Sequence, residues 1–269
     1  MKLQFYKFDP TGNTTILVTS PVPRADQPRI AEKMMARENL CAEQVGFLEE
    51  PILPDARARL RMAGGEFCGN ASMSMAALLA FCGDLPCGAE EAIPLEVSGA
   101  DGIVRCRILR KDSTNFSGIV EMPLPKSITE AALPNGMRVP LVHLRGIAHM
   151  LIPEGTFSPS EAEAIIPSLC EALGVEALGL LAVQKEPLYL KPLVYVRETG
   201  CAVWESGCGS GSAALGACAA HRERRKVDLE IAQPGGTIGV RADYDSGAIR
   251  KIEIRGGVRL VAHGEVYID

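Results

Sequence analysis

Two short cysteine-glycine segments constrain this chain more than any other feature of its sequence. Residues 64–74 read Gly-Gly-Glu-Phe-Cys-Gly-Asn-Ala-Ser-Met-Ser, and residues 206–214 read Ser-Gly-Cys-Gly-Ser-Gly-Ser-Ala-Ala. Each segment places one cysteine, Cys68 or Cys208, in a glycine-bearing turn directly before an apolar stretch. The N-terminus of a helix offers free backbone N–H groups and partial positive charge, which lower the pKa of a thiol. Both cysteines are therefore candidates for proton transfer.

The stretches that follow the two cysteines predict helices buried on every side. No charged side chain occurs within residues 69–82, and the second stretch is uncharged from Gly209 until His221. A helix that is apolar all round belongs inside a folded core. At about 1.5 Å per residue the first helix is about 21 Å long, which matches the depth of a small barrel or sandwich.

The chain reads as an internal duplication of α+β type. Strand-like runs precede and follow both cysteine turns, and the two turns superpose at a spacing of 140 residues. This alignment places Gly69 on Gly209, Ser72 on Ser212 and Ala80 on Ala220. We expect two similar halves that face each other across a cleft, with both helix N-termini pointing into it.

Proline and glycine cluster between Met122 and Gly136, which sets the expected domain boundaries. The sequence predicts an N-terminal half over residues 1–122 with Cys68, a linker over 123–136, and a C-terminal half over 137–269 with Cys208. The last strand could return to the first half. Further helices are expected at 28–39 and 158–173; the latter has a Ser158–Glu161 capping box and ends at Gly174. Strands are expected at 2–8, 14–20, 43–48, 58–62, 95–98, 103–110, 118–122, 138–144, 178–184, 192–197, 201–204, 227–232, 237–242, 249–255 and 258–268.

Composition narrows the functional classes. The net charge is -5 and basic residues are interspersed with acidic ones, so we expect no nucleic-acid surface. No apolar run approaches the roughly 20 residues of a membrane span, and the N-terminus does not resemble a secretory signal. We therefore expect a cytoplasmic protein with no membrane partner. Nine scattered cysteines fit a reducing compartment, and Cys82 with Cys87 lacks the second pair that a zinc site needs, so no metal is expected.

Two thiols in matched helix-capping turns can act on one small molecule from opposite sides. If one is a thiolate and the other a thiol, the first removes a proton from a carbon and the second delivers one to the opposite face. The negative charge left on an amino-acid carboxylate would be stabilised by the two helix N-termini. The sequence has no glycine-rich phosphate loop, and this chemistry needs no cofactor.

The quoted segments resemble the two signatures of the diaminopimelate epimerase family of cofactor-independent amino-acid racemases. The resemblance extends over nearly the whole chain and includes Asn13 in the first turn and Gly146-Ile-Ala-His149, which is similar to that family's Gly-Asn-Pro-His. It implies two halves, each a mixed β barrel wrapped around a central helix, with the active site in the cleft between them. Homodimers are common in this family, so a homodimer is a possible assembly.

The resemblance also implies roles for individual residues. Cys68 and Cys208 would be the acid/base pair. Donors to the substrate carboxylate would be Gly69, Asn70, Gly209 and Ser210, and Asn13 would border the pocket. His149 and Glu205 would assist the thiols and bind the α-amino group. Without the resemblance, each of these residues also has a purely structural interpretation. His149 could be a hydrogen-bonded histidine of the core, and Glu205 could be a solvated residue at the end of a strand. Each cysteine could be a small buried apolar residue.

The sequence departs from the diaminopimelate pattern where that substrate's far carboxylate would bind. Trp204-Glu205-Ser206-Gly207-Cys208 is shorter than the family's Glu-Arg-Gly-x-Gly-Glu-Thr and lacks its arginine, and residues 59–63 stand where an asparagine is expected. Losing a bidentate arginine would cost several kcal/mol of binding. The shortened form is similar to the histidine racemases of this superfamily that serve metallophore biosynthesis. It implies racemisation of a free amino acid, histidine first, with Glu205, Glu66 or His149 meeting the imidazole.

Three alternatives remain open. Diaminopimelate epimerase is one. Another is an isomerase of the phenazine-biosynthesis type, which works with one glutamate and does not need Cys208. Proline racemase, a relative with paired cysteines, fits less well because its turn carries histidine where Asn70 stands. The third is an amino-acid-binding or redox-sensing protein in which Cys68 and Cys208 form a reversible disulfide.

Overall fold

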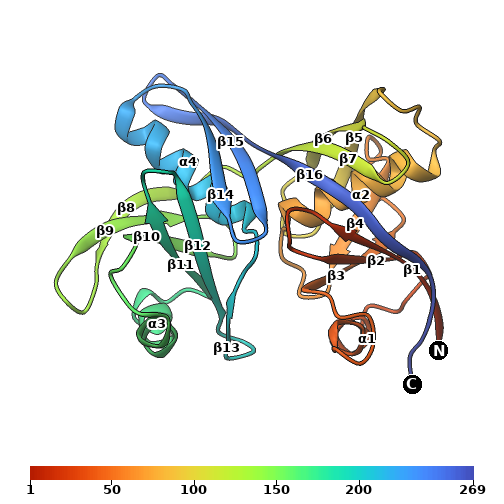
Figure 1. The fold of residues 1–269 in the computed structure, drawn as a ribbon, viewed down its shortest axis with the longest axis horizontal. Coiled ribbons are helices and arrows are strands. Elements are labelled where there is room, and N and C mark those ends of the chain that lie inside the picture. The colour runs from red at the N-terminus through yellow and green to blue at the C-terminus, as the bar shows by residue number, and fades with distance from the viewer. The chain divides into compact units, whose positions relative to one another are not determined.

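The computed structural model describes residues 1–269 and divides the chain into two compact units (Figure 1). Unit 1 comprises Met1–Glu121 together with Arg255–Asp269, and unit 2 comprises Met122–Ile254. Strand β16 (Ala248–Tyr267) therefore begins in unit 2 and ends in unit 1.

Unit 1 is a mixed sheet whose strand order returns to its start. The order runs β1 to β7 in sequence and then β16, and β16 pairs antiparallel with β1. Pairing is parallel between β2 and β3 and between β4 and β5, whereas β5, β6 and β7 form the expected antiparallel meander. The strands are β1 (Lys2–Asp9), β2 (Thr15–Val18), β3 (Gln44–Glu49), β4 (Ala58–Met62), β5 (Glu90–Val97), β6 (Ile103–Arg110) and β7 (Asn115–Glu121).

Helix α2 (Gly69–Cys82) has the bounds expected from its uncharged sequence, and buried residues occupy all of its faces. It contacts β1, β2, β5, β6 and β7, so the strands surround it on several sides. Helix α1 (Gln27–Met35) is instead amphipathic. It packs Ile30, Ala31 and Met34 against Phe5, Val45 and other core side chains.

Unit 2 has the sheet order β15-β14-β12-β11-β10-β9-β8, with β13 added to β12. Its strands are β8 (Ser127–Ala132), β9 (Arg138–His143), β10 (Ala148–Pro153), β11 (Ala177–Gln184), β12 (Tyr189–Val196), β13 (Cys201–Trp204), β14 (Val227–Gln233) and β15 (Gly236–Asp245). Two helices belong to it, α3 (Pro159–Leu173) and α4 (Gly209–Glu223). The capping box at Ser158 and the left-handed Gly174 that ends α3 are both confirmed.

Two local expectations are wrong. Residues 127–132, placed within a linker on their composition, form β8 and pair with β9, and the neighbouring Leu133 joins the core of unit 2. The prolines and glycine around this strand mark the turns at its ends rather than an extended connection. Residues 249–255 and 258–268 are expected as separate strands but are continuous in β16, since the backbone stays extended through Gly256 and Gly257.

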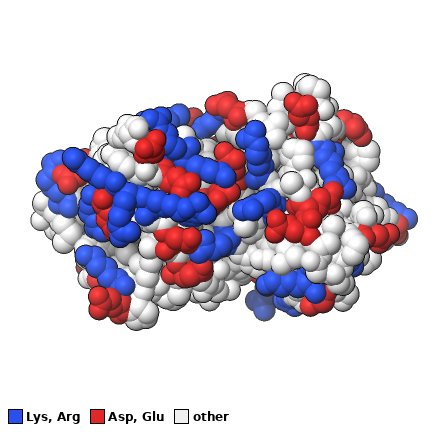
Figure 2. Space-filling model, turned by 90° about the horizontal axis from the view of Figure 1, so that it is seen from above, with Lys and Arg blue, Asp and Glu red and all other residues white.

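Surface charge is mixed in sign. Figure 2 shows Lys and Arg side chains interspersed with Asp and Glu on the face in view. Among the four helices, none combines the length and the apolar character that crossing a membrane would require. The expectations of an α+β chain with mixed sheet pairing and four helices are confirmed.

The close packing of α4 on β15 gives a test of the fold. A Cβ added at Gly216 would lie 2.7 Å and 2.9 Å from the two γ-methyls of Val240, whose β-branched side chain has little freedom to move. Gly216→Ala gains about 1 kcal/mol of helix propensity, but overpacking costs about 1–3 kcal/mol. We expect a net loss in the free energy of unfolding, measured by urea denaturation.

The matched control is the same substitution in a Val240→Ala background, where the obstructing methyl groups are gone. There Gly216→Ala should be neutral or stabilising. Equal losses in both backgrounds would mean that the Gly216–Val240 contact does not set the spacing between α4 and β15.

Candidate functional site

Cys68 is the N-cap residue of α2, and its sulfur takes the place of the usual serine or aspartate oxygen. It has extended backbone angles (φ -133°, ψ 114°), and its Sγ accepts the Ala71 N–H at 3.4 Å. The Ser72 hydroxyl donates to the Cys68 carbonyl at 2.7 Å. A thiol held in this way lies beside the positive end of the helix dipole.

Cys208 repeats this arrangement at the start of α4. Its backbone angles are φ -112° and ψ 105°, and its Sγ accepts the Gly211 N–H at 3.3 Å. The Ser212 hydroxyl donates to the Cys208 carbonyl at 2.8 Å. The superposition of Cys68 on Cys208 and of Ser72 on Ser212, expected from sequence, thus extends to the hydrogen bonds of both turns.

Gln44 is a neighbour of Cys68 that sequence reasoning missed. The Cys68 Sγ donates to Gln44 Oε1 at 3.1 Å, and Gln44 Nε2 donates to Thr15 Oγ1 at 2.7 Å. The Thr15 hydroxyl in turn donates to the Asn13 carbonyl at 3.1 Å. This chain orients the amide so that its oxygen faces the thiol. No motif contains Gln44; only the pairing of β2 with β3 brings it there.

Other predicted residues of unit 1 lie in or near the same turn. Gly69 and Asn70 are buried in the first turn of α2, and Asn13 is buried in the connection from β1 to β2. Glu66 lies two residues before Cys68 at an exposed position. Partial loss of hydration raises the pKa of the Glu66 carboxyl, although backbone N–H groups of Glu66 and Gly64 and the charge of Arg61 oppose the shift.

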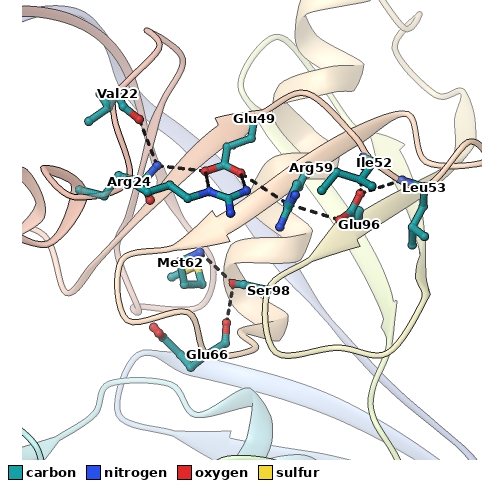
Figure 3. A network of polar contacts seen from close by, with 11 residues as sticks. Val22, Arg24, Glu49, Ile52, Leu53, Arg59, Met62, Glu66, Glu96 and Ser98 are labelled. Atoms are coloured by element: carbon teal, nitrogen blue, oxygen red, sulfur yellow. Dashed lines mark hydrogen bonds and ion pairs between the residues drawn. The ribbon is translucent and has the colours of Figure 1, made fainter.

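Arg59 stands where an asparagine is expected by resemblance, and the structure uses it in an ion-pair network (Figure 3). Its Nε lies 3.5 Å from Glu49 Oε2 and 3.4 Å from Glu96 Oε1. Glu49 also pairs with Arg24, and Glu96 accepts the backbone N–H groups of residues 52 and 53. Arg59 therefore has structural partners on both sides.

In unit 2, Cys208 is buried, with 3% of its surface exposed. Some of the polar groups around it raise the pKa of its thiol, and others lower it. Burial is the largest influence and raises the pKa of the thiol well above its usual value. The charge of Glu205 and a hydrogen bond to its carboxylate raise this pKa further, whereas hydrogen bonds from Ser210 and the Gly211 N–H lower it. The net effect keeps the thiol protonated, and the hydrogen bonds from Ser210 and Gly211 stabilise the thiolate when it forms.

His149 joins this cluster through Ser210. Its Nε2 lies 3.0 Å from Ser210 Oγ, which lies 3.5 Å from Cys208 Sγ. The imidazole is completely buried, and desolvation lowers the pKa of His149 to about 3. The ring fits because Gly179, its partner on β11, has no side chain: a Cβ there would lie 2.1 Å from His149 Nδ1.

The predicted site residues thus form two groups, one in each unit. The thiol of Cys208 is surrounded by His149, Glu205 and Ser210, and Gly209 is buried beside them. Asn13 reaches the other thiol through Thr15 and Gln44. Gln44 and Gly179 are the residues that the sequence did not single out.

The chain matches a protein family over almost its full length. The family model described as the histidine racemase CntK N-terminal domain matches residues 2–267. A histidine racemase of Fusobacterium nucleatum is 32% identical over 272 residues, covering 99% of this chain and 97% of that protein.

Solved structures of lower identity share the fold. A phenazine biosynthesis protein of the PhzF family from Bacillus anthracis superposes with a TM-score of 0.73 at 17% identity and covers 100% of both chains. A probable proline racemase from Agrobacterium radiobacter superposes with a TM-score of 0.70 at 16% identity, covering 99% of this chain and 93% of that one.

Burial of a neutral histidine predicts a pH dependence of stability. The unfolded state takes up a proton near the ordinary pKa of 6.5, whereas the folded state does so only near 3. The stabilisation is therefore complete above pH 6.5 and is lost as the pH falls toward 3. One proton gives a slope of about 1.4 kcal/mol per pH unit within this window.

The comparison is with His149→Gln, which lacks the titrating group. We expect its free energy of unfolding to fall less steeply between pH 6 and 4 than that of the unsubstituted protein, measured by denaturant unfolding at each pH. The carboxylates titrate in both proteins, so the difference in slope isolates His149. Identical slopes would show that the imidazole is protonated in the folded state.

Proposed function

Because this chain belongs to the histidine racemase family, we propose that it interconverts the two enantiomers of free histidine with Cys68 and Cys208 as its acid/base pair. The observation that carries the proposal is the matched capping geometry of the two thiols, each accepting an N–H at 3.3–3.4 Å at the start of a buried helix. Family membership supports the assignment as an amino-acid racemase, and the proposed substrate is a free amino acid.

The proposed architecture is two halves, Met1–Glu121 with Arg255–Asp269 and Met122–Ile254, each a mixed β barrel around its central helix with the substrate in the cleft between them. The strand order of unit 1, which returns from β16 to β1, supports the barrel in that half. We further propose a cytoplasmic enzyme that forms a homodimer and binds neither nucleic acid nor a membrane.

Cys208 is proposed to be the proton donor of the resting enzyme. Its raised pKa keeps the thiol protonated near neutral pH. After it delivers this proton to the α-carbon, the thiolate is stabilised by the Ser210 hydroxyl and the Gly211 N–H. In the reverse direction the thiolate takes the α-proton back.

Cys68 is proposed to act on the opposite face of the α-carbon. When Cys208 donates its proton, Cys68 is the thiolate that takes the α-proton; the Ala71 N–H stabilises this thiolate, and Gln44 Oε1 accepts the S–H that forms. Each direction of racemisation uses one cysteine as base and the other as acid, so both thiols are required.

Removal of the α-proton places negative charge on the substrate carboxylate. We propose that backbone N–H groups at the starts of α2 and α4, with Gly69, Asn70, Gly209 and Ser210, stabilise this charge. Glu205 would bind the α-ammonium group. His149, neutral because of its lowered pKa, would orient Ser210 rather than supply positive charge.

The remaining predicted residues are proposed to border the substrate. Asn13 lies in the connection from β1 to β2, and Glu66 lies in the connection from β4 to α2 that contains Cys68. Glu66, Glu205 and His149 are the candidates for contact with the imidazole.

Exchange of the α-proton tests the function directly. The reduced protein is incubated in D2O with L-histidine, diaminopimelate or proline, each alone and without added pyridoxal or metal. We expect deuterium uptake and inversion with histidine, detected by mass and chiral analysis. Binding of histidine without exchange of its α-hydrogen would contradict the proposal.

Separate substitutions test the two-thiol mechanism. Cys68→Ser and Cys208→Ser should each reduce the rate of racemisation by about 10²–10⁴-fold, the usual contribution of one general acid or base. Cys82→Ser, at the other end of α2, and Cys170→Ser, buried in unit 2, are the matched controls and should retain activity. Full activity of Cys208→Ser would favour a carboxylate isomerase instead.

A further inference from the structure

The carbonyl two residues before each cysteine is held by the end of another strand. In unit 1 the Ser98 hydroxyl, directly after β5, donates to the Glu66 carbonyl at 2.8 Å. In unit 2 the Gly235 N–H, in the turn after β14, donates to the Ser206 carbonyl at 2.7 Å. In both units this strand is the one that follows the buried helix in sequence.

Ser98 connects both ends of the loop that leads to Cys68 (Figure 3). Its Oγ accepts the Met62 N–H at 2.9 Å at the end of β4 and donates to Glu66 at the other end of the loop. The hydroxyl thus bridges the two ends of the loop between β4 and the cysteine turn. Its own N–H donates to the Leu60 carbonyl at 2.9 Å, which fixes Ser98 to the sheet.

Gly99 brings the turn against the backbone of the same loop. Its φ of +73° is a left-handed conformation, and a Cβ there would lie 2.3 Å from the Phe67 nitrogen and 2.7 Å from the Glu66 carbonyl carbon. A glycine is therefore required both by the backbone angle and by the approach. The peptide that enters the cysteine turn rests directly on this glycine.

Gln233, the last residue of β14, completes the arrangement in unit 2. Its Oε1 accepts the Cys208 N–H at 2.8 Å and its Nε2 donates to Ser212 Oγ at 2.7 Å. Since Ser212 also donates to the Cys208 carbonyl, the glutamine amide and the serine hydroxyl bind both backbone groups of the cysteine. The side chain is 4% exposed, so its amide depends on these partners.

We propose that Ser98 and Gln233 are positioning residues, one for each cysteine turn, which set the placement of the two sulfurs relative to their helix N-termini. The proposal rests on the assignment of Cys68 and Cys208 as the acid/base pair. Ser98 binds the Glu66 carbonyl and Gln233 binds the Cys208 N–H, so each acts through the backbone of its turn. A displacement of about 1 Å at a reacting group costs about 10²-fold in rate.

The test combines racemisation kinetics with the reactivity of individual thiols. Ser98→Ala should lower kcat for histidine about ten- to hundredfold with KM changed less than about threefold, since positioning and not binding is lost. Ser98→Thr keeps the hydroxyl and should restore kcat. Methionine is similar in size to glutamine but lacks its hydrogen-bonding amide, so Gln233→Met should lower kcat in the same way.

Ser20→Ala is the matched control in unit 1. Ser20 is half-buried like Ser98, and its Oγ accepts the Gln4 N–H at 2.8 Å on another part of the sheet. The Ser20→Ala protein loses a comparable hydrogen bond and should keep the kcat of the unsubstituted protein. Retention of kcat by Ser98→Ala, at the level of Ser20→Ala, would overturn the proposal.

Alkylation by iodoacetamide, followed for each cysteine by peptide mass spectrometry, needs no substrate. In Ser98→Ala the pH of half-maximal alkylation should rise by about half a unit or more at Cys68, because its sulfur leaves the helix N-terminus. The other cysteines should be unchanged. A protein that racemises nothing but shows this shift would refute the proposed function alone, whereas an unchanged Cys68 profile would refute the positioning role.

Discussion

The hydrogen bond from a backbone N–H to a cysteine sulfur, made once at the start of each buried helix, is the interaction on which the rest of this structure depends. A helix that begins inside a protein exposes N–H groups that water cannot reach, and these groups need acceptors. Cys68 and Cys208 supply them at 3.4 Å and 3.3 Å. The same contact orients each sulfur, so the stability of the helix and the placement of the thiol cannot be separated.

The buried helices restrict what can surround them. Neither α2 nor the first three turns of α4 carries a charge, and small residues let strands approach closely, as at Gly216. Several of the polar side chains that enter these cores are linked by hydrogen bonds. The chain from Asn13 through Thr15 and Gln44 to Cys68 and the pair formed by His149 and Ser210 are such cases. The first ends at Cys68, and the second reaches Cys208 through the Ser210 hydroxyl.

The two cysteine turns are alike in backbone but differ in electrostatics. Burial of Cys208 raises the pKa of its thiol, the Glu205 carboxylate raises it further, and the Ser210 hydroxyl opposes the shift. Cys68 is half-buried and faces an amide oxygen that carries no charge. The repeated capping geometry agrees with the internal duplication expected from sequence, whereas the flanking segments give the two thiols different environments for proton transfer.

The sequence by itself determined the local features: the two capped and uncharged helices, the meander of β5 to β7, and the capping box at Ser158, because each follows from residues close in the chain. It also identified most of the residues around the thiols through paired motifs. Only the tertiary structure decided the roles of Gln44, Gly179, Ser98 and Gln233, which belong to no motif. Their positions depend on which strands pair and in what register, and strand pairing joins residues that are distant in sequence. The placement of residues 127–132 in a linker failed for the same reason, since turn residues mark where a strand ends but not whether it has a partner.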